Sequence, residues 1–161
     1  MKKKNILNWA WQIGLALLIV VLDRVTKDSI MANYSVGEVF AEIPFVADFM
    51  YVQNTGAAFS LLSDNTMLLS LISILFVVAL VIYKIVTKPQ GFMQNLAIVL
   101  FFSGALGNAI DRVIYKFVVD FIDIKWFNFP VFNIADIAIV LGAVVAIIFV
   151  LFFDKSEGNK R

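Results

Sequence analysis

Two aspartates are the residues of this sequence best suited to do chemistry. Asp120 lies in the stretch VVDFID, and Asp136 ends the stretch FNIAD just inside a long apolar run. Two carboxylates brought close together cannot both ionise cheaply, so such a pair holds one proton between them. The ionised member can take a proton from water as the water attacks an amide carbonyl, and the protonated member can donate to the carbonyl oxygen and later to the leaving nitrogen. The pair therefore predicts amide hydrolysis without a covalent intermediate.

The residue types that the chain lacks narrow this chemistry further. The sequence contains no cysteine and no histidine, which excludes disulfides, a cysteine nucleophile, a Ser/His/Asp triad and metal sites built on thiolate or imidazole ligands. The net charge of +1 gives no sign of a nucleic-acid partner. The chain is 61% hydrophobic and only 16% charged, which is more apolar than a soluble domain can hide, so we expect an integral membrane protein.

Four apolar runs have the length needed to cross a membrane. Helices are expected because lipid gives a single segment no other way to satisfy its backbone hydrogen bonds. The runs cover residues about 9–26, 66–86, 92–110 and 131–153. A cleaved signal peptide, suggested by the basic start MKKKN, is disfavoured because no small-residue cleavage site follows the run and Asp23, Arg24 and Lys27 interrupt its end.

The positions of lysine and arginine predict the orientation. If the four helices alternate in direction, the basic residues outside the spans all fall on one side, and the side rich in Lys and Arg is the cytoplasmic one. These residues are Lys2, Lys3, Lys4, Lys84, Lys88, Lys155, Lys160 and Arg161. Both termini are therefore expected in the cytoplasm, and residues 28–65 and the loop of residues about 115–130 are expected on the extracytoplasmic side.

The segment of residues about 35–62 is predicted to form a small extracytoplasmic β-sheet. Its short β-branched and aromatic runs are broken by Gly37, Pro44 and a turn at residues 54–56. The sheet could be a structural cap on the helix ends or a wall that cradles a substrate. The predicted fold is thus an integral membrane α-helical protein, with residues 1–161 forming one membrane-embedded domain of four transmembrane helices and a sheet between the first and second.

Polar residues near the outer ends of the last two helices are spaced to share a face. Asn108 and Asp111 are three residues apart, as are Asn133 and Asp136, and this spacing places each pair on one side of a helix. Alternating helix directions bring both ends to the outer side. The stretch SGALG, residues 103–107, gives the third helix the small residues that allow close helix approach, with incidental glycine as the alternative.

Other charges near the helix ends have a simpler explanation. A charged side chain inside a span costs about 2.5–3.5 kcal/mol on insertion scales, so it needs a partner or a role. Structural ion pairs of Asp23 with Lys27, and of Asp111 with the adjacent Arg112, would supply the partners. Asp123 could be solvated.

Four blocks of sequence together resemble the bacterial lipoprotein signal peptidases, the type II signal peptidases. They are DRVTK at residues 23–27, NTGAAF at 54–59, SGALGNAIDR with VVDFID at 103–123, and FNIAD at 132–136 with Gly142 after it. All four stand in order and cover nearly the whole chain. The resemblance implies a four-helix intramembrane aspartyl protease with an extracytoplasmic sheet and with no metal or other cofactor.

The same resemblance implies roles for the polar residues, with Asp120 and Asp136 as the catalytic pair. Residues that would hold substrate and orient the pair are Asn54, Gly56, Asn108, Arg112 and Asn133, and residues of structural support are Asp23, Lys27 and Asp111. The implied substrate is a prolipoprotein whose lipobox cysteine carries a diacylglyceryl group, cut on the N-terminal side of that cysteine, and inhibition by globomycin is expected. The expected setting is a monomer among the lipids of the bacterial cytoplasmic (inner) membrane, with its active site toward the extracytoplasmic face.

Three positions depart from the family pattern. Arg24 replaces a common glutamine, Ser103 stands where glycine is frequent, and residues 115–117 replace a glycine-containing turn before VVDF. Glycine permits backbone conformations that other residues avoid, so the last change bears on loop geometry and substrate preference.

Two function classes remain as alternatives to the protease. A small proton-coupled transporter could also use membrane carboxylates, but the chain has no internal repeat and its polar residues cluster at one membrane face. A non-catalytic membrane scaffold or chaperone would tolerate asparagine at both Asp120 and Asp136, whereas a protease would lose activity from either change.

Overall fold

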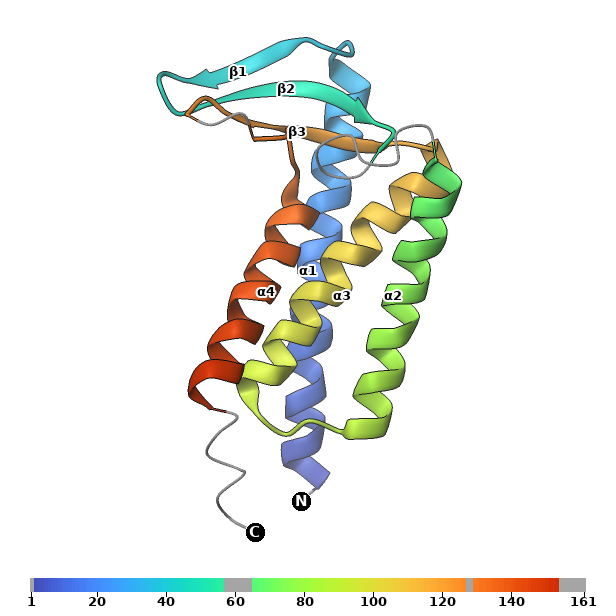
Figure 1. Cartoon of the computed structure of the whole chain (residues 1–161), viewed down its shortest axis with the longest axis vertical. Helices are drawn as coiled ribbons and strands as arrows, with labels where there is room; N and C mark the ends of the chain where they lie inside the picture. Colours follow the sequence, from blue (N-terminus) through green and yellow to red (C-terminus); the bar gives the residue numbers. More distant parts are fainter. Residues whose placement is uncertain (1, 57–64, 127–128, 154–161) are drawn as a thin grey trace.

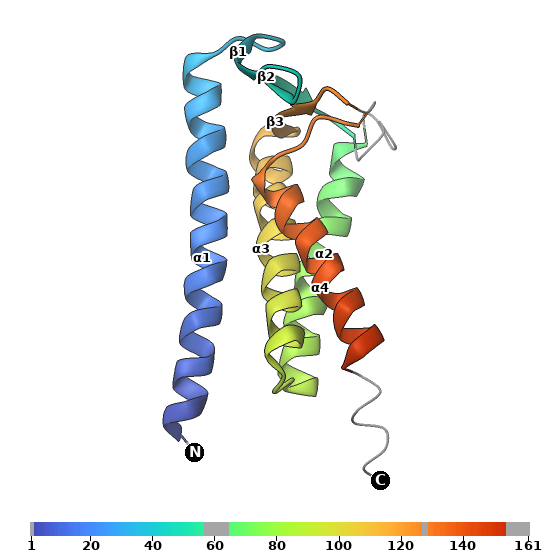
Figure 2. The same ribbon diagram turned by 90° about the vertical axis from the view of Figure 1, so that its left-hand side faces the viewer.

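The computed structural model describes residues 2–56, 65–126 and 129–153, with the backbone alone for residues 2–7. Four helices lie side by side, and a three-stranded antiparallel sheet covers one end of them (Figure 1). The elements are α1 (Lys2–Asn33), β1 (Val39–Ile43), β2 (Ala47–Asn54), α2 (Thr66–Thr87), α3 (Phe92–Tyr115), β3 (Val118–Ile124) and α4 (Ile134–Phe152). In the view turned by 90°, the sheet forms a layer across the end of the bundle (Figure 2). The start of α1 and the end of α4 both lie at the opposite end (Figure 1).

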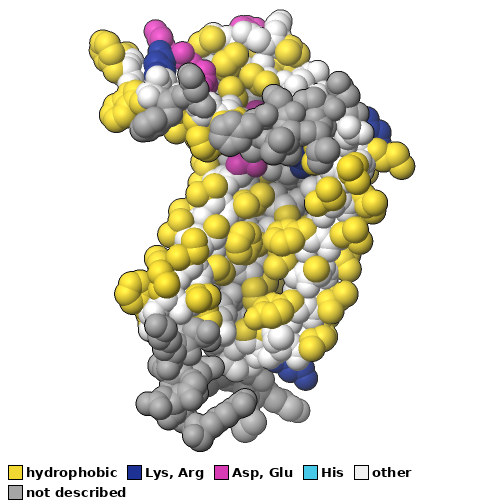
Figure 3. All heavy atoms as spheres, viewed as in Figure 1, with side chains coloured by type: hydrophobic (Ala, Val, Ile, Leu, Met, Phe, Trp, Pro, Cys, Tyr) yellow, Lys and Arg dark blue, Asp and Glu magenta, His cyan; other side chains and the backbone are white. Residues whose placement is uncertain are grey.

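The helices are arranged around α3. All four are long and apolar enough to cross a membrane, over Asn8–Asn33, Thr66–Thr87, Phe92–Tyr115 and Ile134–Phe152. More than half of the α3 span, 56%, is buried in the protein, whereas the buried share is 17% or less in each of the other three. α3 contacts α1, α2 and α4, whose outward side chains are largely hydrophobic. On the face seen in Figure 3 they form a broad hydrophobic surface with charged groups toward its two ends. This arrangement fits the prediction of four transmembrane helices, since lipid is the natural solvent for such a surface.

α3 and α4 approach each other closely at Gly104. A methyl group on Gly104 would lie 2.3 Å from the backbone oxygen of Ala135 and 2.7 Å from Cγ1 of Ile139. A methyl group on Gly107, one turn further along α3, would lie 2.8 Å from a carboxylate oxygen of Asp23 in α1. The small residues of α3 therefore serve the close helix approach that their spacing predicts.

Gly104→Ala should destabilise the protein by about 1–3 kcal/mol, because the contact between α3 and α4 must open to admit the methyl group. This loss should outweigh the gain in helix propensity, which is about 1 kcal/mol. Thermal unfolding in detergent measures the effect. Gly14→Ala in α1 is the matched control, because nothing lies within 4 Å of its added methyl group; its melting temperature should stay equal or rise. Equal melting temperatures for the two variants would contradict the close contact.

The sheet contains a strand that the sequence did not predict. We expected the sheet within residues about 35–62 and a loop over residues about 115–130; the structure instead adds β3 as a third strand beside β2. Residues 57–64, the end of the expected sheet segment, and residues 127–128 lie outside the described residues. β3 is held by a buried cluster of apolar side chains, among them Tyr51, Val119 and Phe121. Asp123, expected to be solvated, is partly exposed and lies opposite Asp48 of β2.

The helices also differ from the apolar runs at their ends. α1 continues to Asn33 and α3 to Tyr115, beyond the predicted ends at about 26 and 110, because charged side chains in these last turns have partners inside the protein. α4 begins at Ile134, with Asn133 as its cap. Lys116 ends α3 at φ 67°, the left-handed conformation that favours glycine, with its N–H bonded to the backbone oxygen of Arg112. The chain therefore makes this turn into β3 without the glycine that the family pattern has there.

Candidate active site

Asp120 and Asp136 lie on the wall of one cavity of about 450 Å³ between β3, α3 and α4. Asp120 comes from the buried part of β3, and Asp136 from the first turn of α4. The polar part of the wall is completed by Asn54, Asn108 and Arg112. The remaining wall is apolar and includes Ile124, Phe132, Ile137, Val140 and Leu141. Among the described residues, no group of three or more carboxylates is placed to hold a metal ion.

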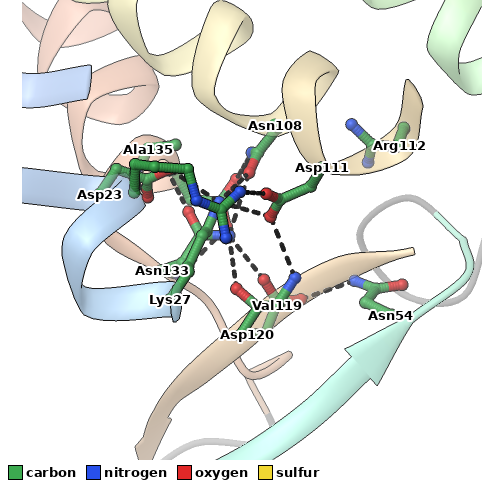
Figure 4. Close-up of polar contacts among 12 residues, drawn as sticks. Asp23, Lys27, Asn54, Asn108, Asp111, Arg112, Val119, Asp120, Asn133 and Ala135 are labelled. Carbon is green, nitrogen blue, oxygen red and sulfur yellow. Dashed lines mark hydrogen bonds and ion pairs between the residues drawn. The ribbon is translucent and has the colours of Figure 1, made fainter. Parts of the chain in front are cut away.

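Each of the four carboxylate oxygens in this pair accepts a hydrogen bond from an amide N–H. Asp120 accepts from the side chain of Asn133 at 2.6 Å and from that of Asn54 at 2.8 Å (Figure 4). Asp136 accepts from the side chain of Asn108 at 2.7 Å and from the backbone N–H of Asn133 at 3.2 Å. The last bond completes a capping box, because the side chain of Asn133 also accepts from the backbone N–H of Asp136. Three asparagines therefore fix both carboxylates in place.

The orientation of these three amides is set by groups that can only donate. The oxygen of Asn54 accepts from the backbone N–H of Gly56 at 2.9 Å, and the oxygen of Asn133 accepts from a backbone N–H at the same distance. The oxygen of Asn108 accepts from the ammonium of Lys27 at 3.0 Å. Since neither an amide N–H nor an ammonium can accept, each side-chain NH₂ must turn toward a carboxylate. The predicted supporting residues Asn54, Gly56, Asn108 and Asn133 thus act on the pair together.

Asp120 can hold a proton near neutral pH. Burial, with the charge of Asp136 as the second cause, raises the pKa of Asp120 to about 7, while the hydrogen bonds from Asn54 and Asn133 oppose the rise. A carboxyl with this pKa exchanges its proton readily at physiological pH. The proton itself belongs to the pair, because titrations of interacting groups are coupled.

Two further buried aspartates hold the backbone beside the pair. Oδ2 of Asp111 accepts from the N–H of Val119 at 3.2 Å, and Oδ1 of Asp23 accepts from the N–H of Ala135 at 3.0 Å (Figure 4). These two N–H groups belong to the residues directly before the two aspartates of the site. Asp23 and Asp111 therefore fix the position of each carboxylate through the main chain.

The buried aspartates are in turn paired with cations of α1. The ammonium of Lys27, which is fully buried, lies 2.8 Å from Asp23 and 2.9 Å from Asp111. Arg24 also pairs with Asp111. The predicted Asp23–Lys27 pair is present, whereas the prediction that Asp111 pairs with Arg112 is wrong. Neighbouring helical residues point about 100° apart, so Asp111 faces α1 while Arg112 faces the cavity.

Comparison with known proteins identifies the family. Residues 15–152 match the model of the family described as signal peptidase (SPase) II. The chain belongs to the signal peptidase II family. It is 36% identical over 152 residues to a lipoprotein signal peptidase of Clostridium tetani, covering 92% of this chain and 97% of that one. It is 42% identical over 144 residues to a lipoprotein signal peptidase of Syntrophomonas wolfei, covering 89% of this chain and 95% of that one.

A solved structure supports the same relationship. It is described as a bacterial membrane enzyme, determined by the in meso method at 2.3 Å resolution, and it matches with a TM-score of 0.85 at 36% identity over 94% of this chain and 93% of that one. The predicted resemblance, the fold and the enzyme class are therefore confirmed. The protein is an aspartic endopeptidase of the signal peptidase II family and a multi-pass bacterial membrane protein.

Arg112 and Arg24 show what the sequence did and did not reveal about this signal peptidase II site. Arg112 was predicted at the site, and its guanidinium lies within 3.4 Å of the oxygen of Gly56 and the hydroxyl of Ser73. Its Nε has no hydrogen-bond partner within the described part of the chain, so it retains a donor for a ligand. The sequence showed Arg24 as a charge at the end of the first apolar run and as a departure from the family pattern, and not as an ion-pair partner. Its spacing of four residues from Asp28, with which it pairs at 2.7 Å, was the available signal for an ion-pair role.

Proposed function

We propose that this signal peptidase II cleaves diacylglyceryl-modified prolipoproteins on the N-terminal side of the lipidated cysteine. The observation that carries the proposal is the pair of carboxylates, the buried Asp120 and the partly buried Asp136, on one largely apolar cavity near the ends of the membrane helices. A peptide anchored by acyl chains lies in the membrane with its cleavage site near the surface. An acid–base pair at this level can reach both the scissile bond and water. The cavity also extends to Val140 and Leu141, which are about half exposed on the outer surface of α4, so acyl chains can lie beside the pair.

In the proposed reaction, the pair works with one shared proton. The ionised carboxylate removes a proton from water as the water attacks the scissile carbonyl, and the protonated carboxyl donates toward the carbonyl oxygen and later helps to protonate the leaving nitrogen. Asn54, Asn108 and Asn133 hold the carboxylates, and Arg112 supplies a donor to the substrate backbone. Gly56 acts by fixing the amide of Asn54.

We place both termini in the cytoplasm and the active site toward the extracytoplasmic face. Lys84 and Lys88 end α2 on the side of the bundle away from the sheet, and the side with more lysine and arginine is the cytoplasmic one. We expect a monomer acting among the lipids of the bacterial cytoplasmic (inner) membrane. The transporter and scaffold alternatives lose their basis because the chain belongs to a peptidase family.

The test is cleavage by the purified protein in detergent of one prolipoprotein prepared with and without the diacylglyceryl group. Mass spectrometry should find a new amino terminus at the lipidated cysteine, and globomycin should block its formation. The unmodified form should be cleaved far more slowly, because it lacks the groups that anchor it beside the pair. Cleavage at another bond, equal cleavage of both forms, or no cleavage by the folded protein would each contradict the proposal.

A further inference from the structure

Lys84 differs from the other cations within the membrane spans. Lys27 and Arg24 each contact buried or half-buried carboxylates, and Arg112 faces the carboxylates of the active site. Lys84, in the last turn of α2, has no carboxylate partner among the residues that the structure describes. A cation inside a membrane protein normally needs a compensating charge.

The groups around Lys84 hold its ammonium without neutralising it. The ammonium donates to the side-chain oxygen of Asn95, and it lies 4.9 Å from the ring centre of Trp9, on the ring face. Asn95 is itself buried, and its NH₂ donates to the backbone oxygens of Pro89 and Gly91 at 2.9 Å and 2.7 Å. Since both of its donors are used, Asn95 can only accept from Lys84. The ammonium is therefore positioned, and N–H donors that Asn95 does not use are available to an anion.

An apolar groove begins beside this ammonium. It has a volume of about 270 Å³ and lies between α1 and α2, with α3 as its floor. The residues that line it are Trp9, Gln12, Ile13, Ala16, Leu80, Val81, Lys84, Ile85, Ile98, Val99 and Phe102. From Trp9 to Ala16 the groove follows α1 for about 10 Å at 1.5 Å per residue, enough for the upper half of an acyl chain. Gln12 and Lys84 are the polar residues of this lining.

The end of the bundle that holds Lys84 is also the basic one. Lys88 lies one turn further on, and residues 2–4 of the sequence are all lysine. Tryptophan near a span end, as at Trp9, is typical of the headgroup level of a membrane. The groove thus has its cation where phosphate groups lie and its apolar part where acyl chains lie.

We propose that this groove binds a phospholipid of net negative charge from the leaflet at the basic end of the bundle. The phosphate accepts from the ammonium of Lys84, and one acyl chain lies between α1 and α2 on the surface of α3. This site is separate from the active-site cavity, which lies at the sheet end of the bundle. The inference does not rest on the proposed function.

The test uses the fluorescence of Trp9 in lipid nanodiscs. Trp11→Phe and Trp126→Phe leave Trp9 as the single tryptophan of the chain. Brominated phosphatidylglycerol or brominated phosphatidylcholine is then titrated into nanodiscs of unlabelled phosphatidylcholine, and bromine on an acyl chain quenches a tryptophan that it contacts. Phosphatidylglycerol should quench at a mole fraction about fivefold lower, the preference expected from one basic residue at the membrane surface.

Three added substitutions separate this site from general attraction to a basic surface. Lys84→Gln should make the two lipids quench equally, whereas Lys84→Arg should retain the preference. Lys88→Gln is the matched control, because Lys88 is exposed on the same end of α2, and it should also retain the preference. Equal quenching by both lipids in the protein with Lys84 intact would overturn the proposal. A preference that survives Lys84→Gln, or that disappears with Lys88→Gln, would also overturn it.

Discussion

Asp120→Asn and Asp136→Asn should each reduce cleavage of the modified prolipoprotein by at least about a thousandfold, which is within the range of general acid–base catalysis. Asparagine can neither take a proton from water nor donate one to the leaving nitrogen. Turnover at saturating substrate, measured for the folded fraction of each variant, checks the result. Asp123→Asn is the matched control, because Asp123 belongs to the same strand but lies opposite Asp48, away from the pair; its turnover should stay close to that of the parent.

The pH dependence of the melting temperature should differ between the parent and Asp120→Asn, because Asp120 holds a proton in the folded protein. The pKa of Asp120 is raised to about 7 in the folded protein, whereas an ordinary aspartate has a pKa of about 3.9. Protonation of Asp120 therefore stabilises the folded state at low pH, and this contribution is lost as the pH rises through 7. From pH 5 to pH 8 the melting temperature of the parent should fall more than that of Asp120→Asn. Parallel curves for the two proteins would contradict a proton held at Asp120.

The fold was largely predictable because hydropathy reports on lipid contact. α2 shows this most clearly: it was predicted over residues about 66–86 and spans Thr66–Thr87. β3 was missed because VVDFID has too few residues to separate a strand from a loop, and its pairing with β2 depends on a segment more than 60 residues earlier in the chain. The end of α1 was placed too early because Asp23 and Lys27 lower the hydropathy there, although each neutralises the other.

The members of the candidate site were predictable, but their connections were not. Sequence spacing placed Asn133 with Asp136 on one helical face, and the structure joins them in a capping box. Spacing could not show that Arg24 rather than Arg112 pairs with Asp111, because that choice depends on how α1 and α3 are rotated against each other. The link from Lys27 to the amide of Asn108 in the candidate site crosses 81 residues of sequence, and no local pattern reports such a contact.

Lys27 should prove to be a positioning residue for the pair as well as an ion-pair partner. Its ammonium holds the oxygen of Asn108, so that the NH₂ of Asn108 faces Asp136. Its charge also acts on Asp120, lowering the pKa of that carboxyl against the effects of burial. Without Lys27, the oxygen of Asn108 keeps only the hydrogen bond from the side-chain NH₂ of Asn133 at 3.1 Å. The amide is then held less firmly toward Asp136 and stabilises the ionised pair less.

The test variant is Asp23→Asn/Lys27→Met, because Lys27→Met alone would leave two buried carboxylates with one cation fewer, a change that costs roughly 3–5 kcal/mol. Turnover at pH 7 should fall about ten- to hundredfold, since a hydrogen bond to a charged group contributes about 1.5–3 kcal/mol. The alkaline limb of the pH–rate profile should move upward, because the pair gives up its last proton less readily without the cation. The other charged groups that face Asp120 are Arg112 and Asp136, and both remain in place in this variant.

Asp23→Asn alone separates this role from a purely structural one. It removes the ion pair at 2.8 Å but keeps the bond from Lys27 to Asn108, so the melting temperature should fall while the orientation of the amide is kept. With Asp23 neutral, the charge of Lys27 is less balanced, and the alkaline limb should stay or move to lower pH. Only the double variant thus shifts the profile to higher pH if Lys27 acts through Asn108. Two profiles that coincide with that of the parent would show that Lys27 only stabilises the fold.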